Sequence, residues 1–156
     1  MTKLTPHTPK TLSQDTFPDD VSIHARRFGR VREAHQTETA EDYVEMIAEL
    51  IERQGEARVV DLATRFGVSH ATVNKVILRL NREGLVVNRK YRSLFLTDEG
   101  KELALKCRRR HQIVVDFLLS LGVPADIAEL DAEGIEHHVS KETLSIFQAF
   151  IEGQKK

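Results

Sequence analysis

Cysteine, tryptophan and long apolar runs are scarce or missing in this chain of 156 residues. It contains one cysteine, Cys107, and no tryptophan. A single cysteine cannot form an internal disulfide, which fits a reducing compartment. No apolar run approaches the roughly 20 residues that span a bilayer, and the first twenty residues lack the apolar segment of a secretory signal. We therefore expect a soluble, cytoplasmic protein that has no membrane partner.

A net excess of charge is also missing, because the formal net charge is −1. The charges are nevertheless unevenly distributed: residues 1–56 hold 7 basic and 11 acidic side chains, and residues 111–156 hold 3 and 8. Residues 57–110 hold 13 basic and 5 acidic side chains. A basic middle between acidic ends predicts that the middle binds a polyanion and that the ends have another role.

Large apolar residues are few in residues 1–35, which also contain three of the four prolines. This composition is typical of a flexible segment. We predict residues 1–35 as a flexible N-terminal tail with at most a weak basic helix near its end. The remaining chain is expected to form two domains, residues 36–106 and residues 107–156.

Helical periodicity begins near Thr39, where "TAED" resembles a capping box, and predicts a helix over about 39–54. A short helix ending at Gly67 and a second helix capped by Ser69 follow, which is the helix-turn-helix pattern. The runs "LVVN" and "SLFLT" then predict a β-hairpin with the basic tip "RKYR". Helix, helix-turn-helix and hairpin, in this order, predict a winged helix.

Three further helices are predicted after the hairpin: one from Thr97 to about Ser120, one over about 124–138, and one that starts at Ser140. The expected fold is therefore mainly α. It consists of a winged helix-turn-helix DNA-binding domain followed by an all-helical domain.

The second helix of the helix-turn-helix has two different faces at about 100° per residue. Val73, Val76, Ile77 and Leu80 form the apolar face. The opposite face would enter a major groove of double-stranded DNA, and basic residues of the hairpin tip would contact backbone phosphates. A solvated basic face is the alternative, but the order of the elements and the local positive charge favour DNA. The predicted DNA-binding residues are Ala71, Thr72, Lys75, Arg79, Arg82, Arg89, Lys90 and Arg92.

Acids and imidazoles gather in a second pattern, in "EGIEHH" and in the first helix. Glu133, Glu136 and His137 lie within an arc of about 100° on one helix. Asp42 and Glu45 have i, i+3 spacing in the helix over about 39–54. Taken singly, each of these side chains, and His111, is more typical of a solvated or hydrogen-bonded group than of a site.

Enzymatic signatures are missing. "EGIEHH" lacks the first histidine of the H-E-x-x-H and H-x-x-E-H metallohydrolase motifs, and no Ser/His/Asp signature or Gly-rich phosphate loop occurs. We therefore do not expect an enzyme. A metallohydrolase is less favoured than the two kinds of DNA-binding regulator described below.

Several segments together carry a family resemblance: "DYVEMI", "ARVVDLATRFGVSHATVNKVILRL", "KYRSLFLTDEGK", "RRRHQIVVDFLLSLGV" and "AEGIEHHVS". From Asp42 to about Ile151 the chain resembles the manganese transport regulators, the manganese-responsive branch of the diphtheria toxin repressor family. The resemblance implies a metal pocket and a dimerisation surface in the helical domain, and it implies a homodimer on a palindromic operator. The implied metal ligands are Asp42, Glu45, His111, Glu133, Glu136 and His137.

The donor chemistry agrees with this resemblance. Four carboxylates repel one another unless cations neutralise them, and two divalent ions would neutralise four carboxylates. Oxygen-rich ligation without thiolate suits Mn²⁺, although Zn²⁺ binds such ligands more tightly and is expected as a non-cognate occupant, and Fe²⁺ is an alternative activator. Cys107 matches no family ligand and is interpreted as a helix-packing residue.

The resemblance implies manganese-dependent transcriptional repression of manganese-uptake genes, and it also allows activation of efflux genes. Metal would set the separation of two recognition helices at about 34 Å, one turn of DNA. The alternative is a metal-independent winged-helix regulator that responds to a small molecule, for which six convergent ligands would have no use.

Overall fold

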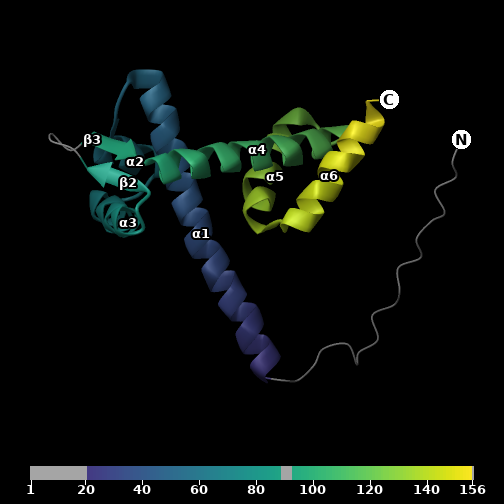
Figure 1. Cartoon of the computed structure of the whole chain (residues 1–156), viewed down its shortest axis with the longest axis horizontal. Coiled ribbons are helices and arrows are strands. Elements are labelled where there is room, and N and C mark those ends of the chain that lie inside the picture. The colour runs from purple at the N-terminus through teal and green to yellow at the C-terminus, as the bar shows by residue number, and fades with distance from the viewer. Residues whose placement is uncertain (1–20, 89–92, 156) are drawn as a thin grey trace, which may run out of the picture. The chain divides into compact units, whose positions relative to one another are not determined.

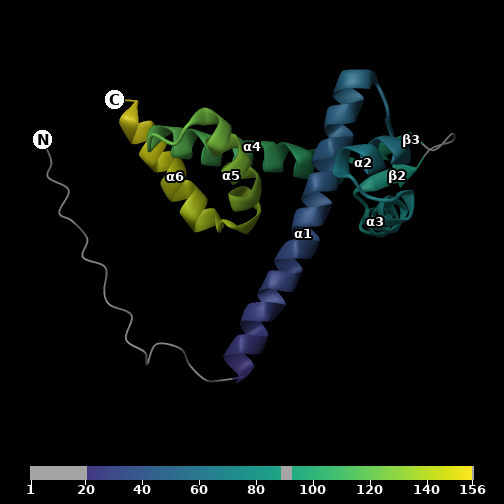
Figure 2. The same cartoon turned by 180° about the vertical axis from the view of Figure 1, so that it is seen from behind.

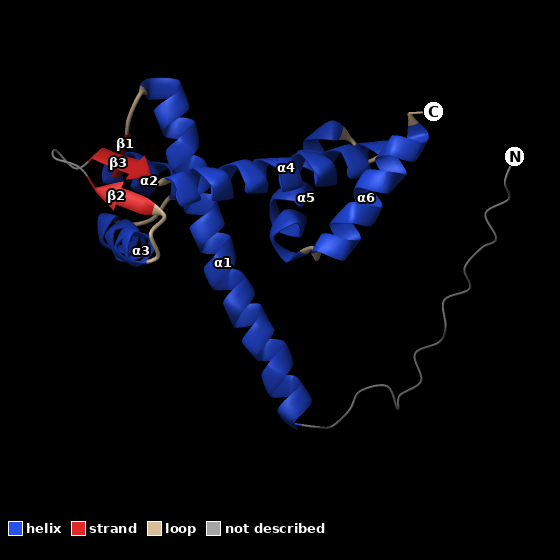
Figure 3. Cartoon of the chain, in the orientation of Figure 1, coloured by secondary structure: helices blue, strands red, loops and turns tan. Residues whose placement is uncertain are grey.

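The computed structural model describes residues 21–88 and 93–155. The chain divides into two units, residues 1–33 and residues 34–156. The described residues are mainly helical, as predicted, with a small sheet (Figures 1 and 3). Their elements are α1 (Val21–Gln54), β1 (Ala57–Arg58), α2 (Val59–Phe66), α3 (His70–Arg82), β2 (Val86–Asn88), β3 (Ser93–Leu96), α4 (Asp98–Ser120), α5 (Ala125–His138) and α6 (Lys141–Gln154).

Helix α1 begins earlier than predicted. It starts at Val21 rather than near Thr39, so residues 21–35, where at most a weak basic helix was expected within the tail, form one continuous helix with the rest of α1. This segment has no proline and is rich in arginine, which favours helix. Extending an existing helix costs much less than nucleating one, so the packed part of α1 can propagate into it. The other residues assigned to the tail, 1–20, lie outside the described residues.

The winged helix follows the predicted order. Gly67 ends α2 in a left-handed conformation, with a φ of 64°. Ser69 then caps α3 by accepting a hydrogen bond from the amide of Thr72 at 3.1 Å. Strands β2 and β3 pair antiparallel with Val86 opposite Leu96. The short strand β1, which was not predicted, adds to the other edge of β3, giving the order β1-β3-β2.

One apolar core joins α1, α2, α3 and the sheet. Its members with no exposed surface include Val44, Ile47, Leu62, Val73 and Leu94. The core contains the predicted apolar face of α3. Because that face packs inward, the polar face of the same helix is left to solvent.

Helix α4 joins the winged helix to the last two helices, and both views show α5 and α6 beside its C-terminal half (Figures 1 and 2). A smaller core of Val114, Val115 and Ala132 lies between them. Thr97 caps α4 and Ser140 caps α6, as predicted. The predicted domain boundary, residues 106/107, falls inside α4, so this one helix serves both halves. In the part of the chain that is described, no helix is long and apolar enough to cross a membrane.

Candidate functional site

The buried imidazole of His137, on α5, faces acids on α1. Its Nε2 lies 3.0 Å from Oδ1 of Asp42, and only 1% of its side chain is exposed. Glu38, one helical turn before Asp42, completes a group whose ligand atoms all lie within 4.8 Å of one another. This group contains two of the six ligands implied by the sequence, and Glu38 is an addition.

A second group forms between α4 and α5. Nδ1 of His111 lies 3.1 Å from Oε1 of Glu136 and 3.5 Å from Oε1 of Glu133. These three residues also have ligand atoms that lie within 4.8 Å of one another. They are three more of the implied ligands, and they come from helices that pack directly against each other.

Glu136 links the two groups. Its Oε1 lies 4.0 Å from Nε2 of His137, and 1% of its side chain is exposed. Its other oxygen, Oε2, is buried and has no hydrogen-bond partner among the described residues. Burial raises the pKa of Glu136 and outweighs the nearby histidines, His137 and His111, which lower it. A buried carboxylate oxygen without a partner is the state that a bound cation would relieve.

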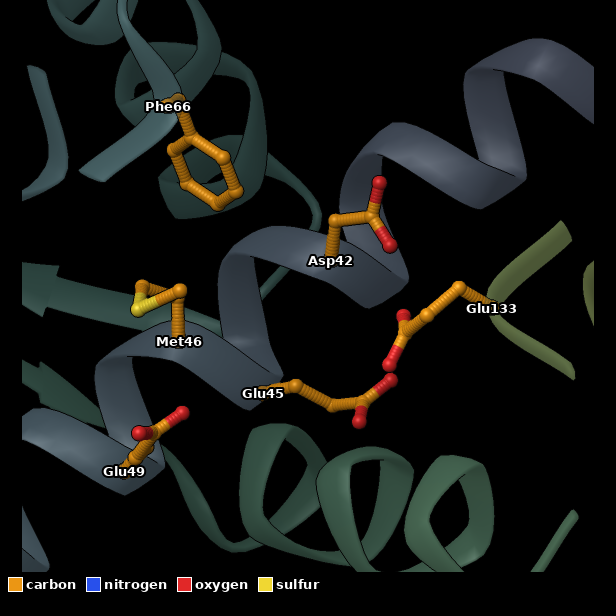
Figure 4. Close-up of a pocket in the computed structure, with 6 residues that line it drawn as sticks. All are labelled: Asp42, Glu45, Met46, Glu49, Phe66 and Glu133. Atoms are coloured by element: carbon orange, nitrogen blue, oxygen red, sulfur yellow. The ribbon is translucent and has the colours of Figure 1, made fainter. Parts of the chain in front are cut away.

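Glu45 lines an open cavity of about 240 Å³ beside these groups. Figure 4 shows its carboxylate turned toward that of Glu133, and Asp42 lines the same cavity. Burial, followed by repulsion from Glu136 and Glu133, raises the pKa of Glu45 to about 7. The structure therefore places all six implied ligands around one region, although Glu45 belongs to neither of the two three-residue groups. The cavity is also lined by Met46, Glu49 and Phe66.

Glu41 is a site residue that the sequence reasoning missed. Its Oε2 lies 2.6 Å from Nδ1 of His137 and also pairs with Nη2 of Arg110, and the residue is 4% exposed. Burial raises the pKa of Glu41, but hydrogen bonds from His137 and Arg110 lower it by a larger amount. The net shift of this pKa is therefore downward. A sequence signal did exist, because Glu41 stands three residues before the buried Val44, at the edge of the apolar stripe of α1.

Glu129 was also missed. Its Oε2 lies 2.8 Å from Nε2 of His111, the ring nitrogen that faces away from Glu133 and Glu136. The i, i+4, i+7 spacing of Glu129, Glu133 and Glu136 on α5 places all three on one helix face. That spacing would have identified Glu129 from the sequence.

Both histidines have a raised pKa. Burial lowers the pKa of His137, but hydrogen bonds to Asp42 and Glu41 outweigh it and raise the value to about 10. Burial likewise lowers the pKa of His111, and the hydrogen bond to Glu129 with the charge of Glu133 raises it overall. Nearby carboxylates therefore favour the protonated form of both imidazoles.

The donor set fits a divalent cation of the manganese type. It combines carboxylate oxygens with two imidazoles, and it contains Oε2 of Glu136, which lacks a hydrogen-bond partner within the described ranges. The nearest thiol is that of Cys107, which is fully buried, and burial raises its pKa to about 12. Cys107 is a packing residue, as predicted, rather than a thiolate ligand.

The predicted DNA-facing side of α3 is exposed at Ala71, Thr72, Lys75 and Arg82. Arg79 differs, because its Nη2 donates to the carbonyl of Gln36 on α1 at 2.9 Å. Its Nε also lies 3.4 Å from Oε1 of Glu83. The other predicted DNA-binding residues, Arg89, Lys90 and Arg92, lie outside the described residues.

Fold and site together define a class: winged-helix proteins whose first helix shares a carboxylate–imidazole cluster with a helical C-terminal half. Two family profiles match the chain. "Iron dependent repressor, N-terminal DNA binding domain" matches residues 35–94. "Iron dependent repressor, metal binding and dimerisation domain" matches residues 97–156.

Individual relatives agree with this class. The chain is 53% identical over 133 residues to the transcriptional regulator MntR of a strain of Escherichia coli, covering 85% of this chain and 86% of that protein. It is 39% identical over 104 residues to the HTH-type transcriptional regulator MntR of Bacillus subtilis, covering 67% of this chain and 73% of that one. The chain belongs to the iron-dependent repressor family, in the branch of the MntR transcriptional regulators.

A solved structure has the same fold. A manganese-dependent transcriptional repressor in complex with manganese aligns with a TM-score of 0.65 and 34% identity, covering 72% of this chain. The chain spans about half the length of that structure, because the alignment covers 52% of it.

Proposed function

We propose that this protein is a manganese-responsive transcriptional repressor that binds operator DNA as a homodimer when its carboxylate–imidazole cluster holds metal. One observation carries the proposal: acids of α1, in the DNA-reading half, converge with acids and imidazoles of α4 and α5. Asp42 meets His137, and Glu45 faces Glu133 across the open cavity. The names of the manganese-dependent relatives support the same function.

The residues that would hold metal are the six implied by the sequence, with Glu38 as a further donor beside Asp42. A bound divalent cation supplies the positive charge that lets several carboxylates share a small volume. Two groups of donors, one around His137 and one around His111, suit two ions per subunit. Oxygen-rich donors without thiolate favour Mn²⁺, with Fe²⁺ as an alternative activator and Zn²⁺ as a non-cognate occupant.

The switch resides in the connection between α1 and α5. When Glu45, Glu133 and Glu136 repel one another, α1 and α5 are pushed apart at the point where they meet. When their charges are neutralised, Asp42 and Glu45 are held against α5. Because α1 packs on the core that carries α3, this also sets the position of the recognition helix.

The proposed output is repression of manganese-uptake genes from a palindromic operator in the cytoplasm. A two-fold dimer places two α3 helices in successive major grooves about 34 Å apart. The dimer surface would be formed by α5 and by flanking apolar residues such as Phe117, Leu118 and Leu121. A coupling of 1–3 kcal/mol between metal and DNA is typical of such switches and corresponds to roughly 5- to 150-fold in affinity.

Fluorescence anisotropy with labelled operator fragments, titrated with protein in Mn²⁺ or in chelator, tests the proposal. We expect tight binding in Mn²⁺, weak binding in chelator, and loss of the difference in Glu133→Gln. Binding that is equally tight in chelator, and unchanged in Glu133→Gln, would favour the metal-independent regulator instead.

A further inference from the structure

Each histidine of the cluster uses its two ring nitrogens in different ways. Nδ1 of His111 faces Glu133 and Glu136, while its Nε2 lies 2.8 Å from Oε2 of Glu129. In His137 the roles are exchanged, because Nε2 faces Asp42 and Nδ1 lies 2.6 Å from Oε2 of Glu41. One nitrogen of each ring thus points into a donor group, and the other meets a carboxylate outside the six implied ligands.

We propose that Glu129 and Glu41 are positioning residues, which fix opposite tautomers of the two histidines and so decide which nitrogen of each ring binds metal. This inference rests on the proposed function for the presence of a metal, and it adds two residues outside the ligand set. A carboxylate that accepts the N–H of a metal-binding histidine holds the ring orientation and increases the basicity of the other nitrogen. Accordingly, His111 keeps its proton on Nε2 and His137 keeps its proton on Nδ1.

The surroundings of Glu41 explain why it stays outside the ligand set. Its Oε2 is shared between His137 and Arg110, and Arg110 also reaches Sγ of Cys107 at 3.6 Å. A carboxylate that is neutralised by a guanidinium gains little from binding a metal cation as well. Glu41 is therefore suited to accepting a hydrogen bond from the imidazole N–H. Glu41 comes from α1 and Arg110 from α4, so the carboxylate that meets the His137 ring is itself held by a second helix.

Glu129 holds the other ring from the same helix as the ligands. It is exposed, and it stands one helical turn before Glu133. Its bond to His111 ties α4 to α5 at a point nearer the start of α5. Because it reaches only Nε2, it leaves Nδ1 free for the donor group with Glu133 and Glu136.

Long-range proton–nitrogen NMR of ¹⁵N-histidine-labelled protein tests the tautomers directly. Cd²⁺ replaces Mn²⁺ as a diamagnetic probe. We expect His111 to show a protonated Nε2 with Cd²⁺ on Nδ1, and His137 to show a protonated Nδ1 with Cd²⁺ on Nε2. The opposite tautomer in either ring, or the same ligating nitrogen in both, overturns the proposal.

Substitutions at Glu129 separate positioning from general structure. Glu129→Ala removes the acceptor and should weaken Mn²⁺ binding, measured by calorimetry, by on the order of 10- to 100-fold. Glu129→Gln keeps an acceptor oxygen and should recover most of the affinity. Asp131→Ala is the matched control, because it removes one exposed acid from the same helix and should leave affinity near wild type.

Glu41 needs a paired design, since removing its charge alone would strand Arg110. The double variant Glu41→Gln with Arg110→Gln keeps an acceptor for His137 without leaving an unpaired charge, and it should retain the Nδ1–H tautomer of His137. Glu41→Ala with Arg110→Gln should lose that tautomer and at least tenfold in Mn²⁺ affinity. Wild-type affinity and tautomers in both Ala variants would overturn the inference, whereas absence of Mn²⁺ binding by the wild type would overturn the proposed function.

Discussion

Arg79 of α3 donates a hydrogen bond from Nη2 to the main-chain carbonyl of Gln36 on α1, over 2.9 Å. The sequence pattern placed Arg79 on the DNA-facing side with Lys75. In the structure the two residues differ, since Lys75 is exposed while Arg79 joins two helices. One residue therefore connects the DNA-reading helix to the helix that carries Asp42 and Glu45.

This difference predicts that Arg79→Ala and Lys75→Ala act differently. Arg79→Ala should weaken DNA binding and also lower stability by about 1 kcal/mol, the net worth of one hydrogen bond. Lys75→Ala should leave the melting temperature nearly unchanged and reduce the slope of log affinity against log salt by about 0.9, if Lys75 contacts one phosphate. Thermal unfolding and anisotropy at several salt concentrations measure both effects. Lys141→Ala, on the exposed start of α6, is the control, and equal DNA binding by Lys75→Ala and wild type would contradict the assigned face.

Glu136→Gln should separate the stability of the metal-free protein from its metal response. The neutral amide removes a buried carboxylate that repels Glu45 and has one oxygen without a hydrogen-bond partner among the described residues. The metal-free melting temperature should stay level or rise. Mn²⁺ affinity should fall by more than the roughly 100-fold that loss of a ligand's hydrogen-bond partner costs.

Calorimetry and thermal unfolding in chelator check this pair of effects, with the exposed Glu142→Gln as control. A clear loss of metal-free stability, together with normal Mn²⁺ binding, would show that Glu136 is a structural acid and not a ligand.

The metal-free protein should lose stability as pH rises from 6 to 9. The pKa of His137 is raised from an ordinary value of 6.5 to about 10, so its stabilising proton is fully present below 6.5 and is lost toward 10. The pKa of Glu45 is raised from 4.5 to about 7, so its ionisation also disfavours the folded state as pH rises through 7. Both shifts act in the same direction.

Melting temperatures of chelator-treated protein at pH 6, 7, 8 and 9 give the test. Saturating Mn²⁺ should reduce the decline, because the cation replaces the protons. Glu45→Gln should reduce the fall in melting temperature between pH 6 and pH 7. A melting temperature that rises across this range would show that the cluster does not hold its protons as described.

Gly100 allows a packing prediction at the start of α4. A Cβ added there would lie 2.1 Å from the carbonyl oxygen of Leu85, which is backbone and cannot easily move. Gly100→Ala should therefore lower stability by about 1–3 kcal/mol, the usual cost of overpacking. Gly153→Ala meets no atom within 4 Å and serves as the control, with stability unchanged or slightly raised. Equal melting temperatures for the two variants would mean that α4 docks on the hairpin differently.

Much of the fold could be predicted from local signals. Ser69, Thr97 and Ser140 cap the predicted helices, and the hairpin strands lie where the β-rich runs predicted them. Two features could not be predicted in this way. Strand β1 has two residues and depends on the pairing of Ala57 with Leu94. For residues 21–35 the sequence predicted no more than a weak basic helix within a flexible tail.

The candidate site could be predicted in part. The six donors implied by the sequence are near one another, but their ligand roles remain predictions. The i, i+4, i+7 spacing of Glu129 with Glu133 and Glu136 indicates a shared helix face. The pairing of Glu41 with Arg110, in contrast, joins positions 69 residues apart. Nothing in the sequence near either residue indicates that partner.

The amino-acid sequence alone determined which helix faces are apolar and where the helices start and stop. It also determined that acids and imidazoles share helix faces. These features follow from periodicity and capping, which involve only a few neighbouring residues. Only the tertiary structure decided which nitrogen of His111 and His137 meets which carboxylate, and that Arg79 binds Gln36. Such choices depend on the angles and separations at which helices pack, and those are set by the whole core rather than by neighbours in the chain.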